Sequence, residues 1–275
     1  GFQFVKNGYL AVDLFFILSG LVISANYSTT LVDARTACRF MALRFFRVYP
    51  LHLVMLIAFI GVECLKVGAQ HTVGMRPEHA PFTGGQSPLS IVSHLLLMQG
   101  LGLMPTPGWN GPSWSISCEF VVYGLFAGAT VLGFVRSRAA LIVGAIATAA
   151  IYAVLAITRG TLDIVYDLGL LRCIAGFFWG VLIHRWAPVT LTHMSKRNHL
   201  CECLAAAGVI VTIAIVSGAL IVTVIPLFIL LLALLRSDSG PVARLLLAAP
   251  VQYLGRISYS VYMVHQLAIV CMLII

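Results

Sequence analysis

Long apolar segments recur along the whole chain, and they restrict its possible folds more than any other feature. A helix that crosses the hydrocarbon core of a bilayer needs about 20 apolar residues. Hydrophobic residues make up 60% of the 275 residues and charged residues only 9%, whereas a soluble domain carries about 25% charged residues. We therefore predict an all-α fold, a polytopic transmembrane helix bundle that lies in the lipid bilayer.

The apolar pattern predicts about nine crossings within a single transmembrane domain. They are expected at residues 9–25, 48–67, 90–103, 114–135, 139–157 and 168–183, twice within 204–235, and from 253 onward. The segment 204–235 is too long for one crossing, so we expect a break near residues 218–226. The connector 236–250 is expected to hold an interfacial helix.

The balance of charge is basic, with 17 Lys and Arg against nine acidic residues and a net charge of +8. The densest positive stretch is the polar connector 26–47, where Arg35, Arg39, Arg44 and Arg47 face one acid, Asp33. Positive loops face the cytoplasm and its anionic lipids, so we place this stretch there. The other basic residues are scattered or stand at segment ends, without an aromatic platform for bases. We therefore expect no nucleic-acid partner.

The seven cysteines lie mostly within apolar runs and are interpreted as small buried residues. Cys201 and Cys203 are too close for an ordinary zinc knuckle, and no second ligand pair stands at metal spacing, so no metal site is expected. The chain begins with Gly1 rather than Met and ends at Ile275 inside an apolar run. We therefore expect it to be truncated at both ends.

Arg44 and Arg47 stand at the start of a long apolar run, three residues apart, and would share one face of a helix. They could simply anchor a helix end at the interface. They could also bind an anion. Other polar residues within apolar segments favour the second reading, because an anchor alone would not need them.

Asp13 is an ionisable residue inside an apolar segment, which makes it a functional candidate by default. Helical spacing places Asp13, Ile17, Gly20 and Ser24 on one face, a small and polar stripe in a helix rich in Phe and Leu. The alternative is structural, with close helix packing along the stripe and Asp13 capping the helix start.

Glu119 is a second buried-acid candidate, and Ser115, Glu119 and Tyr123 would line one side of a helix. Its carboxyl group could act as a general acid or base, could orient a catalytic partner, or could form a structural pair with an arginine.

Ser258, Tyr262 and His265 fall on one helical face, either as a polar cavity wall or as interhelical hydrogen-bonding groups. Arg172 is a further intramembrane charge and needs a counter-charge. Glu119, Asp13 and a bound anion are the candidates, and Asp163 and Asp167 lie nearby in sequence. No phosphate-binding glycine loop or nucleophile elbow is present, so these features fit an enzyme or a transporter.

Four stretches, in order along the chain, resemble the signatures of the acyltransferase-3 family of membrane acyltransferases. Residues 8–20 resemble the pattern G-x-x-x-V-D-x-F-F-x-x-S-G, and residues 44–50 resemble an Arg-x-x-Arg-x-x-Pro run. Residues 114–119 resemble a Trp-Ser-x-x-x-Glu segment, and residues 255–265 resemble G-x-x-S-Y-x-x-Y-x-x-H. The resemblance covers essentially the whole chain.

The resemblance implies a bundle of about ten helices, the first of which would be missing here, in a multi-pass protein of the bacterial inner membrane. It implies an O-acyltransferase that moves an acyl group, commonly acetyl, from acyl-CoA to a hydroxyl of a cell-envelope or exported carbohydrate. Acyl-CoA would be a co-substrate, with no permanently bound cofactor. Arg44 and Arg47 would hold the CoA phosphates, which guanidinium groups match bidentately. The implied donor- and substrate-binding residues are Arg44, Arg47, Arg172, Ser19, Trp114, Ser115, Tyr123, Ser258, Tyr262 and His265.

The sequence departs from the family at one point, because the presumed catalytic histidine of the family lies on a helix that precedes the motif of residues 8–20. We expect that histidine upstream of Gly1 and expect the chain alone to be inactive without it. Asp13 and Glu119 are then the catalytic candidates in supporting roles, which orient or polarise the histidine. Direct transfer and an acyl-enzyme relay through Ser19 and His265 both stay open.

Two other functions are compatible with the same residues. A secondary transporter or flippase would place Asp13, Glu119 and Arg172 along a pathway, although the inverted repeats common in transporters are not evident. A catalytically inactive family member could also act only as an acyl conduit.

Overall fold

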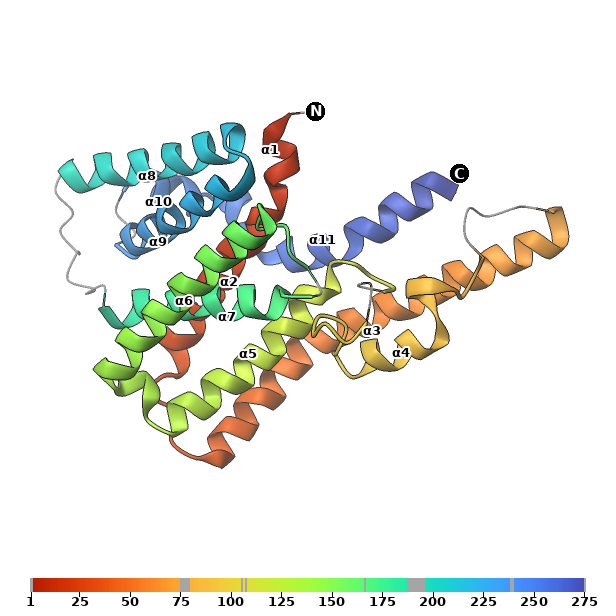
Figure 1. The fold of residues 1–275 in the computed structure, drawn as a ribbon, viewed down its shortest axis with the longest axis horizontal. Coiled ribbons are helices and arrows are strands. Elements are labelled where there is room, and N and C mark those ends of the chain that lie inside the picture. The colour runs from red at the N-terminus through yellow and green to blue at the C-terminus, as the bar shows by residue number, and fades with distance from the viewer. Residues whose placement is uncertain are drawn as a thin grey trace. The chain divides into compact units, whose positions relative to one another are not determined.

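The computed structural model describes residues 2–74, 80–104, 106, 108–165, 167–186, 196–237 and 240–274, and every regular element in them is helical (Figure 1). The all-α prediction is therefore confirmed. The α-helices are α1 (Gln3–Lys6), α2 (Leu10–Tyr27), α3 (Ala34–Val73), α4 (Pro88–Leu95), α5 (Ser113–Val131), α6 (Arg138–Arg159), α7 (Gly169–Trp186), α8 (Lys196–Ile215), α9 (Val224–Leu235), α10 (Pro241–Leu246) and α11 (Ala249–Ile274).

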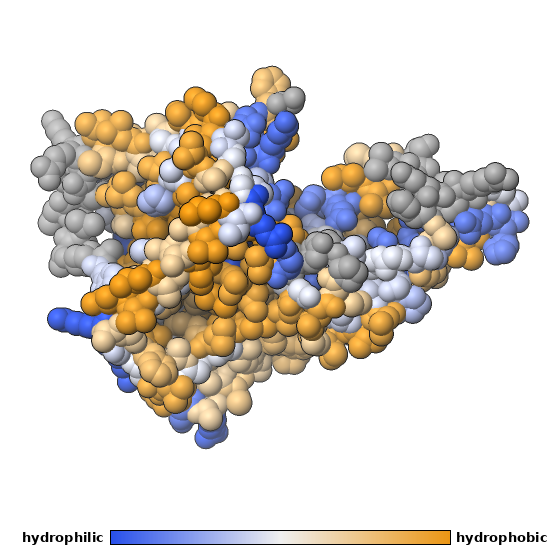
Figure 2. All heavy atoms as spheres, in the orientation of Figure 1, coloured by the Kyte–Doolittle hydropathy of each residue, from blue (hydrophilic) through white to orange (hydrophobic). Residues whose placement is uncertain are grey.

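Five helical segments in the described residues are long and apolar enough to cross a membrane, by length and composition. They are Gln3–Tyr27, Ala34–Thr72, Ser113–Val131, Arg138–Arg159 and Gly218–Leu235. Hydrophobic side chains dominate the visible surface over α6, where Val143, Ile146 and Ile157 are exposed (Figure 2). Apolar side chains on an outer helix face suit contact with lipid, so these segments confirm the predicted polytopic helical bundle.

The remaining predicted crossings have other forms. Residues 168–183 and 253 onward lie in helices α7 and α11, and the segment 204–235 breaks between α8 and the 3-10 turn that starts at Gly218. The predicted break near 218–226 is thus confirmed at its N-terminal edge, where Gly218 has φ +66°. The predicted interfacial helix within 236–250 corresponds to α10, six residues long.

The stretch 90–103 differs from the predicted crossing. Its helix, α4, is only eight residues long and ends at Leu95. Leu97 then adopts φ 54°, and Gly102 adopts φ 74°, so the backbone leaves the helical region twice within a few residues. An eight-residue helix spans about 12 Å, far less than the hydrocarbon thickness of about 30 Å.

Helix α3 corrects the predicted connector 26–47. It runs for 40 residues without a break, including Pro50, and so measures about 60 Å, roughly twice the hydrocarbon thickness. The four predicted connector arginines therefore lie on about the first four turns of this helix. The apolar run that follows them is the part of α3 that fits the membrane.

The start of α3 is set by local hydrogen bonds. The Asp33 carboxylate accepts a hydrogen bond from the Thr36 amide at 2.8 Å, and the Thr36 hydroxyl accepts one from the Asp33 amide at 3.2 Å. This reciprocal cap satisfies amides that the helix itself cannot bond. The bond from the Thr36 amide also lowers the pKa of the exposed Asp33 carboxyl below its usual value.

The chain divides into two compact units. The first unit comprises residues 1–37, 125–164 and 171–255, and the second comprises residues 38–124, 165–170 and 256–275. In the first unit, glycines bring α2 and α7 into backbone contact. A Cβ atom added at Gly20 would overlap the Phe177 carbonyl, and one added at Gly180 would overlap the Ile17 carbonyl. Small residues at such spacing let membrane helices approach closely.

The predicted stripe on α2 is confirmed as its buried face. Asp13, Ile17 and Ser24 are each 0% exposed, and Gly20 is buried. The stripe therefore combines the two alternatives, because its small residues pack against α7 while its acid forms the contacts described below.

Replacing Gly180 with alanine should destabilise the first unit, because the new methyl group would overlap the backbone of Ile17 and Leu21. Overpacking usually costs about 1–3 kcal/mol, and a clash with backbone should lie at the upper end. The measurement is the thermal unfolding midpoint in detergent. Gly128→Ala is the matched control, because nothing lies within 4 Å of a Cβ atom added there. Equal midpoints for both variants would contradict the described packing.

Candidate functional site

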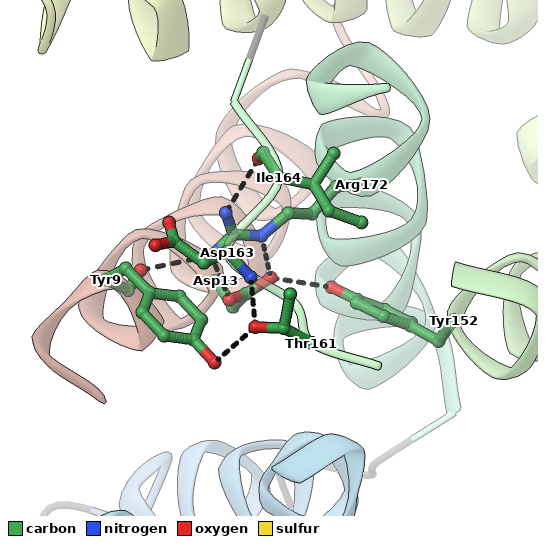
Figure 3. Close-up of polar contacts among 7 residues, drawn as sticks. All are labelled: Tyr9, Asp13, Tyr152, Thr161, Asp163, Ile164 and Arg172. Carbon is green, nitrogen blue, oxygen red and sulfur yellow. Dashed lines mark hydrogen bonds and ion pairs between the residues drawn. The ribbon is translucent and has the colours of Figure 1, made fainter. Parts of the chain in front are cut away.

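The predicted intramembrane charges Asp13 and Arg172 form a buried ion pair in the first unit (Figure 3). Both residues are 0% exposed. The Arg172 Nε atom donates to Asp13 Oδ1 at 2.9 Å, and Nη2 donates to Oδ2 at 2.5 Å, so the pair is bidentate. Of the three counter-charges that the sequence left open for Arg172, the structure supplies Asp13.

Further groups complete the surroundings of this pair. Arg172 also donates to the carbonyl oxygens of Ile164 and Tyr9, each at 3.0 Å, and lies 5.5 Å from the centre of the Tyr9 ring. The Tyr152 hydroxyl of α6 donates to Asp13 Oδ1 at 3.4 Å. These contacts join α2, α6 and α7 around one polar centre. Tyr152 was missed by the sequence analysis, although a single hydroxyl within an apolar helix was a visible signal.

The geometry favours a structural role for this pair. Removing two charges from water costs several kcal/mol per ion, and only good geometry and further hydrogen bonds repay that cost. Here the guanidinium group contacts a carboxylate and two carbonyl groups. Asp13 does not cap the start of α2, as one alternative held, because its side chain contacts α6 and α7 instead. Its supporting catalytic role and the substrate-binding role of Arg172 stay predictions.

The second unit contains the other predicted acid, Glu119 on α5. The prediction that Ser115, Glu119 and Tyr123 share one side of the helix is confirmed, since all three are buried. The Tyr123 hydroxyl donates to Glu119 Oε1 at 2.6 Å, which fixes the direction of the carboxylate. The ring of Phe40, on α3, meets the Tyr123 ring edge-on with 5.9 Å between centroids.

Arg44 and Arg47 lie on α3 close to this carboxylate group. The Arg44 guanidinium lies 5.8 Å from the centre of the Phe40 ring, so Phe40 contacts both Arg44 and the tyrosine that holds Glu119. Arg47 is exposed. Arg44 and Glu119 therefore belong to one cluster of side chains in the second unit, which the sequence treated as separate motifs.

The predicted residues of α11 mostly hold the chain around them. The Tyr262 hydroxyl lies 3.1 Å from both Ser115 Oγ and the Pro112 carbonyl oxygen. His265 is exposed and its Nδ1 lies 2.6 Å from the Tyr262 carbonyl oxygen. Ser258 is exposed as well.

Two predicted residues lie elsewhere. Ser19 is half-buried on α2, in the first unit. Trp114, at the start of α5, is buried and packs against Gly169 so closely that a Cβ atom there would overlap its ring. The structure thus gathers some predicted residues into two clusters and leaves the others apart.

The segment between α4 and α5, described at residues 96–104, 106 and 108–112 and called the α4–α5 loop below, was not expected. Leu97 and Trp109 of this loop belong to the same apolar cluster as Met55, Leu56 and Phe59 of α3. The loop therefore lies at the depth of the apolar part of α3. Non-helical backbone at that depth is tolerated only inside protein or beside a water-filled cavity.

Side chains satisfy the backbone of this loop. The Ser117 hydroxyl donates to the Leu97 carbonyl at 2.5 Å and accepts from the Gly100 amide at 3.1 Å. The Gly111 amide donates to Gln266 Oε1 at 2.5 Å, and Asn110 donates to the Met263 carbonyl at 3.2 Å. The polar residues near the resembling motifs therefore serve this loop.

Comparison with known proteins identifies relatives. The family model described as an acyltransferase domain matches residues 2–273. A stretch of 122 residues is 38% identical to the acyltransferase MdmB of Streptomyces mycarofaciens and covers 43% of this chain and 27% of that protein. A stretch of 126 residues is 32% identical to Protein 2 in the picA locus of Rhizobium radiobacter and covers 44% of this chain and 65% of that protein. The matches thus span less than two thirds of either relative, and no solved structure matches the chain.

Breaking the buried pair on one side should be far more harmful than removing both charges. We expect Arg172→Gln and Asp13→Asn each to cost about 3–5 kcal/mol of unfolding free energy, because each leaves the other charge buried without its counter-charge. The double variant should lose less than the sum of the two. Unfolding in detergent measures these values, with exposed Asp163→Asn as the control. Additive losses would show that the two side chains do not interact.

Proposed function

The chain belongs to the acyltransferase-3 family, and we propose that it acts as a membrane O-acyltransferase. It moves an acyl group, acetyl in the simplest case, from acyl-CoA to a hydroxyl of a cell-envelope or exported carbohydrate. The observation that carries this proposal is the family match over residues 2–273. A relative named as an acyltransferase adds support. The protein resides in the bacterial inner membrane on this account.

The donor site lies on the basic half of α3. Arg44 and Arg47 stand where the basic turns of α3 meet its apolar run, which places them at a membrane surface. The excess of positive charge there favours the cytoplasmic face, where acyl-CoA is available. Guanidinium groups bind phosphate bidentately and keep their charge, which suits the phosphates of CoA.

The transfer step needs a base and an oriented thioester. The acceptor hydroxyl oxygen attacks the thioester carbonyl carbon, the carbon–sulfur bond breaks, and CoA leaves as a thiolate. The proton of the hydroxyl passes to a base and then to the thiolate sulfur. Glu119 supports this step in the second unit, because Tyr123 holds its carboxylate in one direction beside the arginine cluster.

The pairing of Asp13 with Arg172 argues against the rival transporter function. A translocation pathway needs charges that face the transported solute. Both members of this pair are 0% exposed, and the carboxylate and guanidinium bond each other. Asp13 then acts as a positioning residue that holds α2, α6 and α7 together.

The test uses protein expressed from its complete gene in inverted membrane vesicles, with acetyl-labelled CoA supplied on the cytoplasmic face. In Arg44→Ala/Arg47→Ala, transfer of label to membrane carbohydrate should fall about 100-fold in kcat/KM, because a charge-assisted hydrogen bond contributes about 1.5–3 kcal/mol. The Michaelis constant for acyl-CoA should rise.

The matched control is Arg35→Ala/Arg39→Ala, which removes the same charge from two exposed arginines of the same helix. Transfer should stay near the wild-type rate in this variant. Equal losses in both double variants would refute the donor site. Absence of transfer from acetyl-CoA and from longer acyl-CoAs by folded wild-type protein would refute the proposed function.

A further inference from the structure

His52 is a buried histidine of α3 that the preceding sections do not use. It lies two residues after Pro50, in the apolar half of the helix, and is 1% exposed. Its ring lies almost parallel to that of His94 on α4, with 6.1 Å between centroids and 10° between planes. Both residues belong to the second unit.

The hydrogen bonds of His52 fix its tautomer. Its Nε2 atom lies 2.9 Å from the His94 carbonyl oxygen, and a carbonyl oxygen can only accept. The proton of the neutral ring is therefore on Nε2, and Nδ1 carries a lone pair. A carbonyl that holds the far nitrogen of an imidazole in this way does the work that a carboxylate does in a Ser-His-Asp arrangement.

The lone pair on His52 Nδ1 has no hydrogen-bond partner among the described residues. A buried acceptor without a donor costs free energy, so native structures supply one, from protein, ordered water or a ligand. His52 Nδ1 therefore identifies a place that awaits a hydroxyl or another donor.

The surroundings of His52 are polar at membrane depth. Helix α4 is inverted, with Leu89 and Leu96 at its outer side, exposed by 73% and 63%, while Ser90 and His94 are buried. The α4–α5 loop continues from this helix at the depth of the apolar part of α3. Such a segment persists in a membrane where it is enclosed by protein or borders a hydrated space.

We propose that His52 is a catalytic residue that receives the hydroxyl group of the acyl acceptor on Nδ1. This proposal rests on the proposed function and deepens it. The Nδ1 lone pair takes the hydroxyl proton as the oxygen attacks the thioester carbonyl carbon. The carbon–sulfur bond breaks, and the imidazolium returns the proton to the departing CoA thiolate. The ligand is an alcohol, such as a sugar hydroxyl, and the base lies within this chain rather than upstream of Gly1.

The groups that face His52 leave it as the base of this site. Among the described residues, the titratable rings around it are those of Tyr49, with centroids 6.1 Å apart, and His94. The Tyr49 hydroxyl donates to the Leu95 carbonyl at 3.0 Å. The His94 Nδ1 atom lies 2.8 Å from the Ser90 carbonyl oxygen, which fixes that ring as well.

The test compares His52→Gln with wild type in the vesicle assay. A glutamine amide can still donate to the His94 carbonyl but offers no basic nitrogen at the Nδ1 position. We expect kcat to fall about 100-fold or more, as for the loss of a general base. We also expect the decline of the wild-type kcat toward low pH to disappear in the variant, which a purely structural role would not cause.

The matched control is His71→Gln, at an exposed position near the end of the same helix, which should keep the wild-type rate. A second variant, His52→Asn, keeps an acceptor near the Nδ1 position without basicity and should show the same loss. Folding is checked by the thermal unfolding midpoint.

The outcomes separate the inference from the function on which it rests. A folded His52→Gln protein that transfers label within a few-fold of wild type would show that Nδ1 meets only buried water, and it would overturn the inference. Failure of both His52 variants to fold would make the residue structural and overturn it too. Inactive wild-type protein would instead refute the proposed function itself.

Discussion

The ion pair between Asp13 and Arg172 is the interaction on which the first unit depends. A bilayer offers no water to a buried charge, so an ionised side chain inside a membrane protein must find its partners within the protein. The glycines of α2 and α7 bring the two backbones together, and Tyr152, Tyr9 and Ile164 surround the pair. The bond geometry and the close helix packing therefore support each other.

The second unit meets the same constraint for the backbone. The α4–α5 loop is irregular at membrane depth, and Ser117, Asn110 and Gln266 supply hydrogen bonds for it. Polar residues that look catalytic in the sequence thus hold the enclosure of a polar region. Within that enclosure, His52 keeps an acceptor without a partner, and Glu119 is held by Tyr123 near the arginines of α3.

Much of the fold follows from apolar length and helical spacing. The stripe from Asp13 to Ser24 and the face of Ser115, Glu119 and Tyr123 were predictable because 3.6-residue periodicity needs no tertiary information. The early start of α3 and the short α4 were not, since caps and positive φ angles break or extend helices without changing hydropathy. The partner of Arg172 required the spatial arrangement, and His52 lay unnoticed in an apolar run.

The most direct test of the account is a doubly labelled acyl-CoA, with one label on the acyl group and another on CoA, supplied to vesicles that hold the wild-type protein from its complete gene. An acyltransferase releases one free CoA thiol for each acyl group that enters membrane carbohydrate, and neither event occurs when carbohydrate is absent. That balance is the predicted result. Entry of both labels into the vesicles together, or folded protein that releases no thiol, would contradict acyl transfer.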